Sequence, residues 1–331
     1  MAASILTGIY TLTPAHCGTG QTSGAVDLPI AREPHTRFPV LPASGLKGAA
    51  RSTLNEKEHA DKELARRLFG PDVNAKEKGD EPEALEAGSL VILEGRLLLY
   101  PLRSLQRPFL YATCPLILER LERDLRALAM GDSVLGKDWV VPRVSSRPGS
   151  DTSVPSALVT DKGLAGQTLV VEDLVYTGGE VGELPRGDAL TKIFQRLLPD
   201  AEDATRERVA ESLVVLPDCD FADVVQRVTP VQARIKLDDE TKTTSGAGGN
   251  LWYEETLPPD CLFAVPVTGR AGYRKKDKNE EPAGEFAALL KKIHGERHAI
   301  QIGGNETVGE GFCWWTAHGP GSTRGGEASH D

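Results

Sequence analysis

The sequence predicts an α+β fold in which strands and helices alternate along one chain. Residues 4–13 (SILTGIYTLT) are rich in strand-forming residues, and residues 89–101 (SLVILEGRLLLYP) form a continuous apolar run of strand length. Residues 113–130 place leucine at every third or fourth position, which is the period of a helix. The sequence contains no internal repeat of the length found in solenoid proteins, so a solenoid is not expected.

The first part of the chain continues this alternation. A glycine-rich loop follows the first strand, and a short strand is expected at 38–41, between prolines. Residues 44–69 have helical spacing, and Gly70-Pro71 is expected to end that helix. Residues 72–88 are charged and poor in apolar side chains, which predicts a surface loop.

The second half contains shorter elements. Residues 140–190 hold short β-like pieces among Gly, Pro and Ser, and residues 207–216 predict a short amphipathic helix. Two strand-like runs within 228–257 predict a β-hairpin, whose polar loop is either a mobile turn or a finger that contacts a partner. Beyond it we expect a strand at 262–268, a helix at 284–294, a strand, glycine-rich turn and strand within 299–315, and a disordered tail at 319–331.

Composition predicts a soluble globular protein of the cytoplasm. The 331 residues can bury one large core with insertions, or form two closely packed domains. No apolar run is long enough to cross a bilayer, and the N-terminus lacks the basic segment and cleavage site of a secretory signal. The five cysteines are scattered without a CxxC pair, which argues against a disulfide framework or a zinc site.

The net charge of −10 counts against a nucleic-acid-binding protein, because such proteins usually present a basic face. The distribution of charge is more informative than its sum. Between Met1 and Leu54 the acids Asp27 and Glu33 are outnumbered by basic residues, whereas residues 200–223 are strongly acidic. An acidic chain can therefore still present one basic groove near its N-terminus.

A glycine-rich loop and the helix start that follows it, within residues 16–51, are suited to hold an anion. The glycines that let backbone N–H groups approach a ligand closely are Gly18, Gly20 and Gly24. Ser44 can cap a helix that carries Lys47 in its first turn and Arg51 one turn later. A phosphate at this helix start would meet free N–H donors and two cations.

Asp27 is an isolated carboxylate in the same loop, and it has no evident packing role beside Leu28 and Pro29. It either caps a local turn or takes part in chemistry. The sequence has no HExxH, GxSxG or GxxxxGK[ST] motif, and no GxGxxG after a strand. A small-molecule enzyme, or binding of a nucleotide cofactor of the usual type, is therefore not expected.

Two stretches resemble the RAMP superfamily of CRISPR effector proteins. They are residues 14–51 (PAHCGTGQTSGAVDLPIAREPHTRFPVLPASGLKGAAR) and residues 300–312 (IQIGGNETVGEGF). The form DLPIxRExHTxFPxxPxSxLKG is similar to the backbone (stem) subunit of the Cmr complex, type III-B. Residues 251–258 (LWYEETLP) add to the match, and residues 72–225 add little.

The resemblance implies a modified RRM (ferredoxin-like) palm that carries insertions and a protruding β-hairpin thumb. We expect residues 1–318 to form a single domain of this kind. Its insertions are expected near 72–88 and 140–225, and its thumb near 228–257. Residues 319–331 are expected to be a disordered tail.

The resemblance also implies an activity and a set of partners. Relatives of this kind stack into a filament of identical copies on a CRISPR guide RNA, with other Cmr-complex subunits and no membrane. Complementary target RNA is cut at intervals of roughly six nucleotides, where a displaced nucleotide lets its 2′-OH attack in line with the leaving oxygen. We therefore expect an endoribonuclease that uses Mg²⁺ or another divalent cation. A non-cleaving guide-RNA-binding scaffold and the equivalent type III-A (Csm) stem subunit remain open.

Under this resemblance Asp27 takes the place of the family's catalytic aspartate. A carboxylate there can accept the 2′-OH proton or hold the divalent cation, whose coordination shell phosphate oxygens and water would complete. His16 is expected as a proton shuttle or phosphate contact, or else as a structural histidine. Glu254, beside Trp252 and Tyr253, is expected near the displaced nucleotide; alternatively this segment packs the hairpin onto the palm.

Guide-RNA contacts are expected from the glycine-rich loop, the helix start and the C-terminal glycine turn. The residues are Gly18, Gly20, Ser44, Lys47, Arg51, Gly303 and Gly304. Contacts of this kind position phosphates and carry no sequence information, which suits a filament that must accept any guide. The alternatives are a plain solvated helix face for the two cations and tight packing against the first strand for the two C-terminal glycines.

Overall fold

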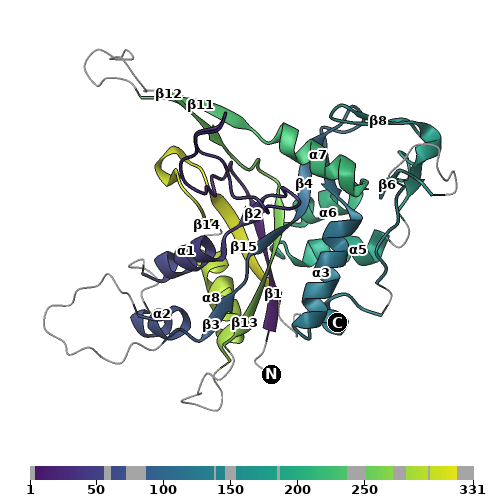
Figure 1. The fold of residues 1–331 in the computed structure, drawn as a ribbon. Helices are drawn as coiled ribbons and strands as arrows, with labels where there is room; N and C mark the ends of the chain where they lie inside the picture. Colours follow the sequence, from purple (N-terminus) through teal and green to yellow (C-terminus); the bar gives the residue numbers. More distant parts are fainter. Residues whose placement is uncertain are drawn as a thin grey trace, which may run out of the picture.

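A large mixed sheet runs through the molecule (Figure 1). A computed structural model describes residues 4–55, 61–71, 87–137, 139–145, 154–184, 187–236, 251–270, 281–296 and 299–318. The main path of the sheet is, in spatial order, β14 (Ile300–Gln301), β15 (Phe312–His318), β1 (Ser4–Thr11), β13 (Leu262–Gly269), β4 (Gly95–Arg103), β5 (Phe109–Thr113), β10 (Leu213–Val215), β6 (Ala157–Val159) and β9 (Val181–Glu183). Off this path, β2 (Val40–Leu41) pairs with β4, and β3 (Leu90–Ile92) pairs with β13.

Two groups of helices accompany this sheet at opposite ends (Figure 1). The group at the β14 and β3 end is α1 (Ala43–Asn55), α2 (Lys62–Phe69) and α8 (Pro282–Glu296). The group at the β5 to β9 end is α3 (Pro115–Ala127), α4 (Gly131–Val134), α5 (Gly187–Arg196), α6 (Asp203–Glu211) and α7 (Asp218–Val228). Two short 3₁₀ helices, η1 (Gly178–Glu180) and η2 (Glu306–Val308), lie in connections.

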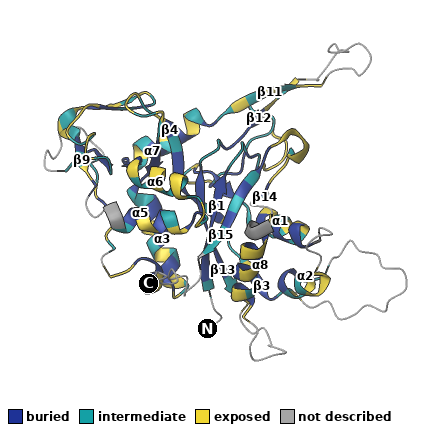
Figure 2. Ribbon diagram, turned by 180° about the vertical axis from the view of Figure 1, so that it is seen from behind, coloured by how far each residue is buried: buried dark blue, intermediate teal, exposed yellow. Residues whose placement is uncertain are grey.

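Strand β1 lies in the interior of the sheet, hydrogen-bonded on both sides, antiparallel to β13 and to β15. Its residues after Ser4 are all buried, as its position between two neighbours requires (Figure 2). Gly8 is needed at its middle, since a Cβ there would lie 2.4 Å from the carbonyl oxygen of Leu197. The first strand predicted from the sequence is thereby confirmed.

The predicted hairpin is also confirmed. Strands β11 (Val231–Ile235) and β12 (Leu251–Glu255) pair antiparallel and project away from the main sheet (Figure 1). A second antiparallel pair, β7 (Leu169–Val171) and β8 (Leu174–Tyr176), accounts for β-like pieces expected within 140–190. The hairpin tip at 237–250, the charged segment at 72–86 and the tail at 319–331 lie outside the described residues.

Three predicted elements differ from the structure. The helix expected at 44–69 is two helices, α1 and α2, and Gly70 with φ +88° ends the second as expected. The apolar run at 89–101 is two strands, β3 and β4, which both pair with β13, and β2 pairs with the start of β4, where Leu41 is opposite Gly95. The helix expected at 207–216 ends at Glu211, and the next residues form β10.

Strand β10 was missed because its sequence is a plain apolar run, LVV, that periodicity cannot distinguish from a helix end. Parallel pairing with β5 and antiparallel pairing with β6 decide its conformation, and these contacts are remote in sequence. Helices α5 and α7 and strand β5 were likewise not predicted. The predicted α+β class nevertheless holds, with strands and helices interleaved along the chain.

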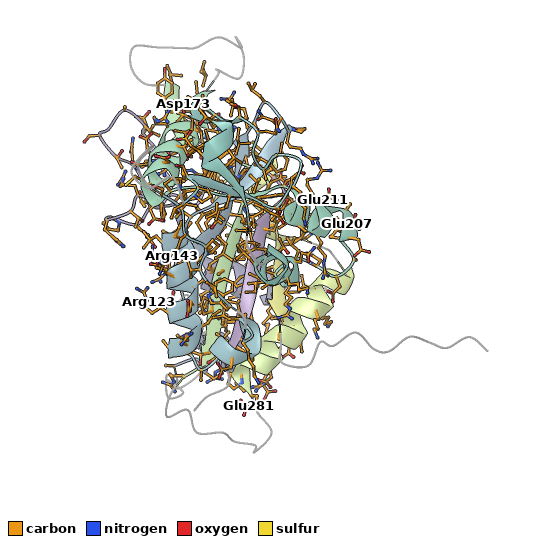
Figure 3. The ribbon with its side chains drawn as sticks, turned by 90° about the vertical axis from the view of Figure 1, so that its right-hand side faces the viewer. Arg123, Arg143, Asp173, Glu207, Glu211 and Glu281 are labelled. Atoms are coloured by element: carbon orange, nitrogen blue, oxygen red, sulfur yellow. The ribbon has the colours of Figure 1, made fainter. Side chains whose placement is uncertain are left out.

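Acidic side chains of α6 lie apart from Arg123 and Arg143 (Figure 3). Figure 3 shows Glu207 and Glu211 on α6 on the opposite side of the view from Arg123 and Arg143. The acidic segment predicted from residues 200–223 therefore includes an exposed face of α6. Among the described helices, none combines the length and the apolar character that a bilayer crossing requires.

Candidate nucleic-acid interface

The long loop that follows β1 is held in place by two remote segments. Ala15 exchanges two backbone hydrogen bonds with Leu257, just after β12, at 3.0 and 2.9 Å. The N–H of Gly304 donates to the carbonyl oxygen of His16 at 3.0 Å, and the N–H of Gly311 donates to that of Pro14 at 2.7 Å. The loop after β1 is therefore held between the base of the hairpin and the glycine-rich turn of residues 303–311 that precedes β15, called here the glycine turn.

A cavity of about 330 Å³ opens where this loop, the start of α1 and the glycine turn meet. Six residues predicted for RNA binding or catalysis line it: His16, Gly18, Gly20, Ser44, Gly303 and Gly304. Its other walls include the apolar side chains of Leu41, Leu46 and Ile302. Residues from three distant parts of the sequence are thus brought to one concave surface.

Two glycines make this close arrangement possible. Gly303 has φ +95°, and a Cβ there would lie 2.4 Å from the carbonyl oxygen of His16. A Cβ on Gly18 would lie 2.3 Å from Nε2 of His16. At Gly303 a side chain fits only if the backbone moves, so glycine is required there, whereas a side chain at Gly18 would displace the ring of His16.

The two predicted cations do not line the cavity. Lys47 lies on α1 with a partly exposed side chain. Arg51 donates from Nη2 to the carbonyl oxygen of Gly70, at the C-terminal end of α2. Arg51 therefore makes a contact between two helices, which the helical spacing alone could not have indicated. Guide-RNA binding by both residues stays a prediction.

Asp27 lies at the base of the hairpin, outside the cavity lining. Its Oδ2 accepts a hydrogen bond of 2.8 Å from the backbone N–H of Tyr253. The adjoining Leu28 exchanges backbone hydrogen bonds with β12, donating to Tyr253 O at 3.1 Å and accepting from Glu255 N at 2.9 Å. Within the described residues Oδ1 of Asp27 has no hydrogen-bond partner, so one carboxylate oxygen remains available.

With one available carboxylate oxygen, Asp27 could give a metal ion only one protein ligand. The described residues contain no group of three or more His, Cys, Asp or Glu side chains that could hold one. Asp27 fits a weakly held divalent cation whose remaining ligands are phosphate oxygens and water, as is common for Mg²⁺.

His16 is oriented by the hairpin. Its Nδ1 lies 2.8 Å from the carbonyl oxygen of Glu255, an acceptor that has no proton to give. Nδ1 therefore carries the proton and donates it, and in the neutral ring Nε2 is left as the acceptor beside Gly18. The ring thus presents an acceptor at the cavity wall.

Glu254 is buried and engaged by three side chains. Its Oε1 accepts a 2.5 Å hydrogen bond from Asn305 and lies 3.4 Å from Nδ1 of His16, and its Oε2 lies 3.0 Å from Nε of Arg234. Such a carboxylate holds other groups in place. The structure brings Glu254 close to His16, and its catalytic role stays a prediction.

Glu255 points to the other face of β12 and holds the loop that contains Asp27. Its Oε2 accepts from the backbone N–H of Ile30 at 3.0 Å, and its Oε1 accepts from Arg32 at 2.6 Å. Arg32 also donates to Thr229 at 2.9 Å. Sequence reasoning missed this role of Glu255 and Arg32, because each belongs to a separate motif and no local pattern indicates that the two side chains meet. Only the pairing of Leu28 with β12 brings them together.

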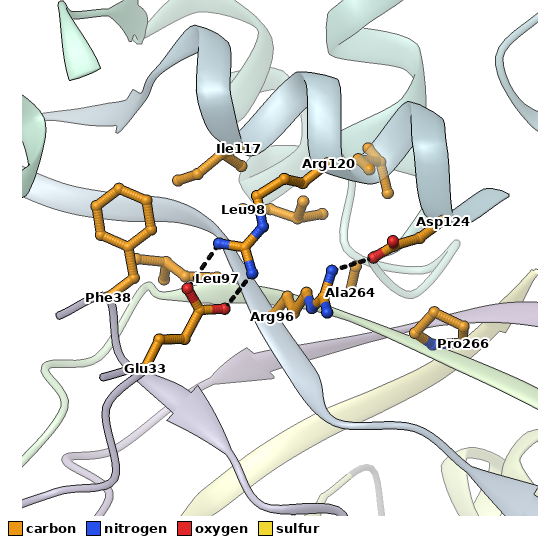
Figure 4. A pocket seen from close by; sticks show the side chains of 11 residues that line it. Glu33, Phe38, Arg96, Leu97, Leu98, Ile117, Arg120, Asp124, Ala264 and Pro266 are labelled. Carbon is orange, nitrogen blue, oxygen red and sulfur yellow. Dashed lines mark hydrogen bonds and ion pairs between the residues drawn. The ribbon is translucent and has the colours of Figure 1, made fainter. Parts of the chain in front are cut away.

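A buried ion pair fixes the far end of the same loop. Arg120 of α3 donates to both oxygens of Glu33, at 2.6 and 2.5 Å (Figure 4). A small cavity lies beside the pair, where Arg96 also pairs with Asp124. Burial by itself raises the pKa of Glu33. Hydrogen bonds from Arg120 and Thr36 and the charge of Arg120 lower it by more, so the pKa lies below its usual value.

We expect Arg120→Met to lower the free energy of unfolding by about 3 kcal/mol at pH 7, because it leaves Glu33 buried without its cation. Since the folded-state pKa of Glu33 is lowered, the wild-type contribution is present above the unfolded pKa of about 4.3 and is lost as the pH falls through the folded value. Urea unfolding at pH 7 and at lower pH measures both effects. Arg123→Met, on the same helix but exposed, is the control, and an equal loss there would contradict the assignment.

Comparison with known proteins places these features in a family context. Residues 8–314 match the model of the RAMP superfamily. The chain is 35% identical over 315 residues to the CRISPR system Cmr endoribonuclease Cmr4 of Pyrococcus furiosus, covering 93% of each chain. Oligomeric Cmr4 from Pyrococcus furiosus has a similar structure, with a TM-score of 0.68 and 27% identity, covering 96% of this chain and 98% of that one.

A narrower similarity bears on the type III-A alternative. The CRISPR system Cms endoribonuclease Csm3 of Enterococcus italicus is 47% identical, but over 49 residues, which are 14% of this chain and 23% of that protein. The Cmr relative matches along almost the whole length, and the resemblance that was drawn from residues 14–51 and 300–312 is confirmed. The comparisons therefore favour the Cmr form over the Csm form.

Proposed function

The chain belongs to the RAMP superfamily, and from that membership we propose that it is the backbone subunit of a type III-B CRISPR effector complex, which binds CRISPR guide RNA and cleaves complementary target RNA. The relative that is 35% identical over 93% of the chain is named a Cmr endoribonuclease, which supports the assignment of an endoribonuclease. Further copies of the chain and other Cmr-complex subunits are its protein partners. Its place of action is the cytoplasm, where guide and target RNA meet.

The observation that carries the proposal is that β12 holds both the cavity wall and Asp27, at separate places. The cavity gathers six of the predicted residues at the start of α1, and its His16 is bonded to the carbonyl oxygen of Glu255. Asp27 lies outside the cavity lining, is bonded to the N–H of Tyr253, and keeps one carboxylate oxygen available. A guide strand held in the cavity and a target strand paired to it would then meet Asp27 at the hairpin.

The cavity suits a nucleic-acid backbone. The N-terminal turn of α1 supplies N–H donors for a phosphate, and the glycines, of which Gly304 gives its own N–H to His16, let an RNA backbone lie close to the cavity wall. Apolar walls at Leu41 and Ile302 give a sugar a surface to pack on. None of these groups distinguishes one base from another, so the binding is independent of sequence. We assign Gly18, Gly20, Ser44, Gly303, Gly304 and the Nε2 of His16 to this contact, and Lys47 to a neighbouring phosphate.

Cleavage requires a 2′-OH, the phosphorus and the leaving 5′-oxygen to come into line. The hairpin supplies this geometry by displacing one target nucleotide, and positioning of this kind contributes a large share of the rate. The 2′-oxygen forms a bond to phosphorus, and the 2′-OH proton leaves toward Asp27 or a water beside it. The bond to the 5′-oxygen breaks, and that oxygen takes a proton from water. Mg²⁺ held by Asp27, phosphate oxygens and water would stabilise the charge on the phosphate. The products are a 2′,3′-cyclic phosphate and a 5′-hydroxyl.

Removal of divalent cations tests this mechanism. A complex assembled with guide RNA should cut a labelled complementary RNA at regular intervals in Mg²⁺, and EDTA should lower the rate by about 100-fold or more. Target binding should persist in EDTA, because base pairing with the guide carries it. A non-complementary RNA is the control. Undiminished cutting in EDTA would contradict the metal-assisted step, and a purified complex without bound RNA would contradict the guide-binding role.

A further inference from the structure

The hairpin is held to the rest of the molecule by side chains on both of its faces. In its register Gln232 pairs with Glu254 and Arg234 with Trp252, so these four side chains share a face. The residues of the opposite face include four large exposed side chains: Val231, Ile235, Leu251 and Tyr253. Glu255, on that same opposite face, holds Ile30 and Arg32, and the other side-chain contacts that orient the hairpin are made by its polar face.

Those contacts form a closed ring of four side chains, Arg234, Glu254, Asn305 and Glu310, called here the thumb ring. Arg234 forms an ion pair with Glu254, with Nε 3.0 Å from Oε2 but not in hydrogen-bond geometry, and it donates a hydrogen bond to Glu310 from Nη2. Asn305 closes the ring by donating from Nδ2 to Glu254 at 2.5 Å and to Glu310 at 2.9 Å. Two strands of the hairpin are thereby joined to the glycine turn.

The thumb ring also connects the two surfaces of the proposed site. Asn305 lies in the same turn as Gly303 and Gly304, which line the cavity, and Gly304 donates to His16. On the hairpin side, the residue before Glu254 is Tyr253, whose N–H binds the carboxylate of Asp27. A shift of the hairpin base relative to the glycine turn would therefore change the position of Asp27 relative to the cavity.

Charge balance makes Arg234 the critical member. Glu254 and Glu310 are both buried, with side chains 4% and 7% exposed, and both contact one guanidinium. Without that guanidinium the two carboxylates would face each other, and Asn305 would be the one member of the ring that donates to them. Buried like charges without a cation are strongly unfavourable, so the ring would open.

We propose that Arg234 is a positioning residue, which through the thumb ring fixes the hairpin base and so places Asp27 for the cleavage of target RNA. This inference rests on the proposed function. It assigns the ring an effect on the rate of the chemical step and not on the binding of guide or target. Misplacement of a reacting group by about 1 Å can cost up to 100-fold in rate.

The test uses the whole effector complex assembled with guide RNA, with single-turnover cleavage of a labelled target and separate measurement of target binding in EDTA. Arg234→Met should lower the cleavage rate about 10- to 100-fold and leave target affinity and guide content within about 3-fold of the wild type. Arg234→Met with Glu310→Gln should recover most of the rate, because it removes the second carboxylate and supplies an amide donor. Arg234→Lys, which keeps the charge but cannot form both contacts, should be intermediate.

Arg67→Met is the matched control, because Arg67 is equally exposed, at 24% against 23%, and pairs with Glu285 between α2 and α8. It should leave cleavage unchanged. Wild-type cleavage by Arg234→Met, no recovery in the double variant, or a loss of guide RNA parallel to the loss of rate would each overturn the inference. If Asp27→Asn is inactive in the same assay while Arg234→Met is fully active, the inference about Arg234 is wrong and the proposed function still holds. A wild-type complex that does not cut would overturn the proposed function and the inference together.

Discussion

Asp27→Asn is expected to abolish the cleavage of target RNA while guide and target RNA stay bound. Asparagine keeps the size of the side chain and an oxygen that can accept the hydrogen bond from Tyr253, so the loop should keep its place. The substitution removes the negative charge that would take the 2′-OH proton or hold the cation. Since general acid–base catalysis alone contributes about 10²- to 10⁴-fold, we expect the rate to fall about 1,000-fold or more.

Single-turnover cleavage of a labelled complementary RNA measures this effect, with guide content and target binding determined on the same preparation. Asp173→Asn is the control, because it changes an exposed carboxylate that pairs with Arg227 on another part of the surface. Equal cutting by the Asp27 variant and the wild type would place cleavage in another subunit. The chain would then be a guide-RNA-binding scaffold.

Gly303→Ala is expected to disrupt the cavity and release the guide RNA. Its φ of +95° strains any residue with a Cβ, and that Cβ would lie 2.4 Å from the carbonyl oxygen of His16. Strain costs about 1–2 kcal/mol, and overpacking against backbone adds about 1–3 kcal/mol. We expect the free energy of unfolding to fall by about 3 kcal/mol and guide affinity to fall at least 10-fold.

Gly309→Ala, in the same turn, measures the effect of backbone strain without a steric clash. Gly309 has φ +83°, but a Cβ there would have no heavy atom within 4 Å. It should lose about 1 kcal/mol and keep the guide RNA. Urea unfolding and the RNA content of the purified complex measure both variants. Equal effects of the two substitutions would show that the close approach of Gly303 to His16 does not shape the binding surface.

Local patterns predicted the elements that depend on local contacts. Strand β1, helix α3 and the β11–β12 hairpin each carry their own periodicity, so the sequence alone identified them. Strand β10 depends instead on parallel pairing with β5, which lies about a hundred residues earlier in the chain, and it was taken for the end of a helix. Whether an apolar run of three residues becomes a strand or part of a helix depends on the elements that pack beside it.

The predicted site residues divide in the same way. A glycine that is needed for a positive φ or a close backbone contact, such as Gly303, can be recognised from its place in a glycine-rich motif. The cavity brings six of the residues predicted in this way together. Arg51 looked like a second cation for RNA, yet its guanidinium contacts the end of α2. Arginine side chains are long, and the direction in which one points depends on packing that no spacing rule contains.

The sequence by itself determined the family, the α+β class, the glycine-lined loop and the carboxylate Asp27, because each is carried by residues close together in the chain. Only the tertiary structure decided that Glu254, Glu255, Arg234 and Glu310 hold the loop, the hairpin and the glycine turn in one arrangement. The physical reason is that buried charges need partners, and strand register and loop contacts select those partners from residues as much as about 240 positions apart.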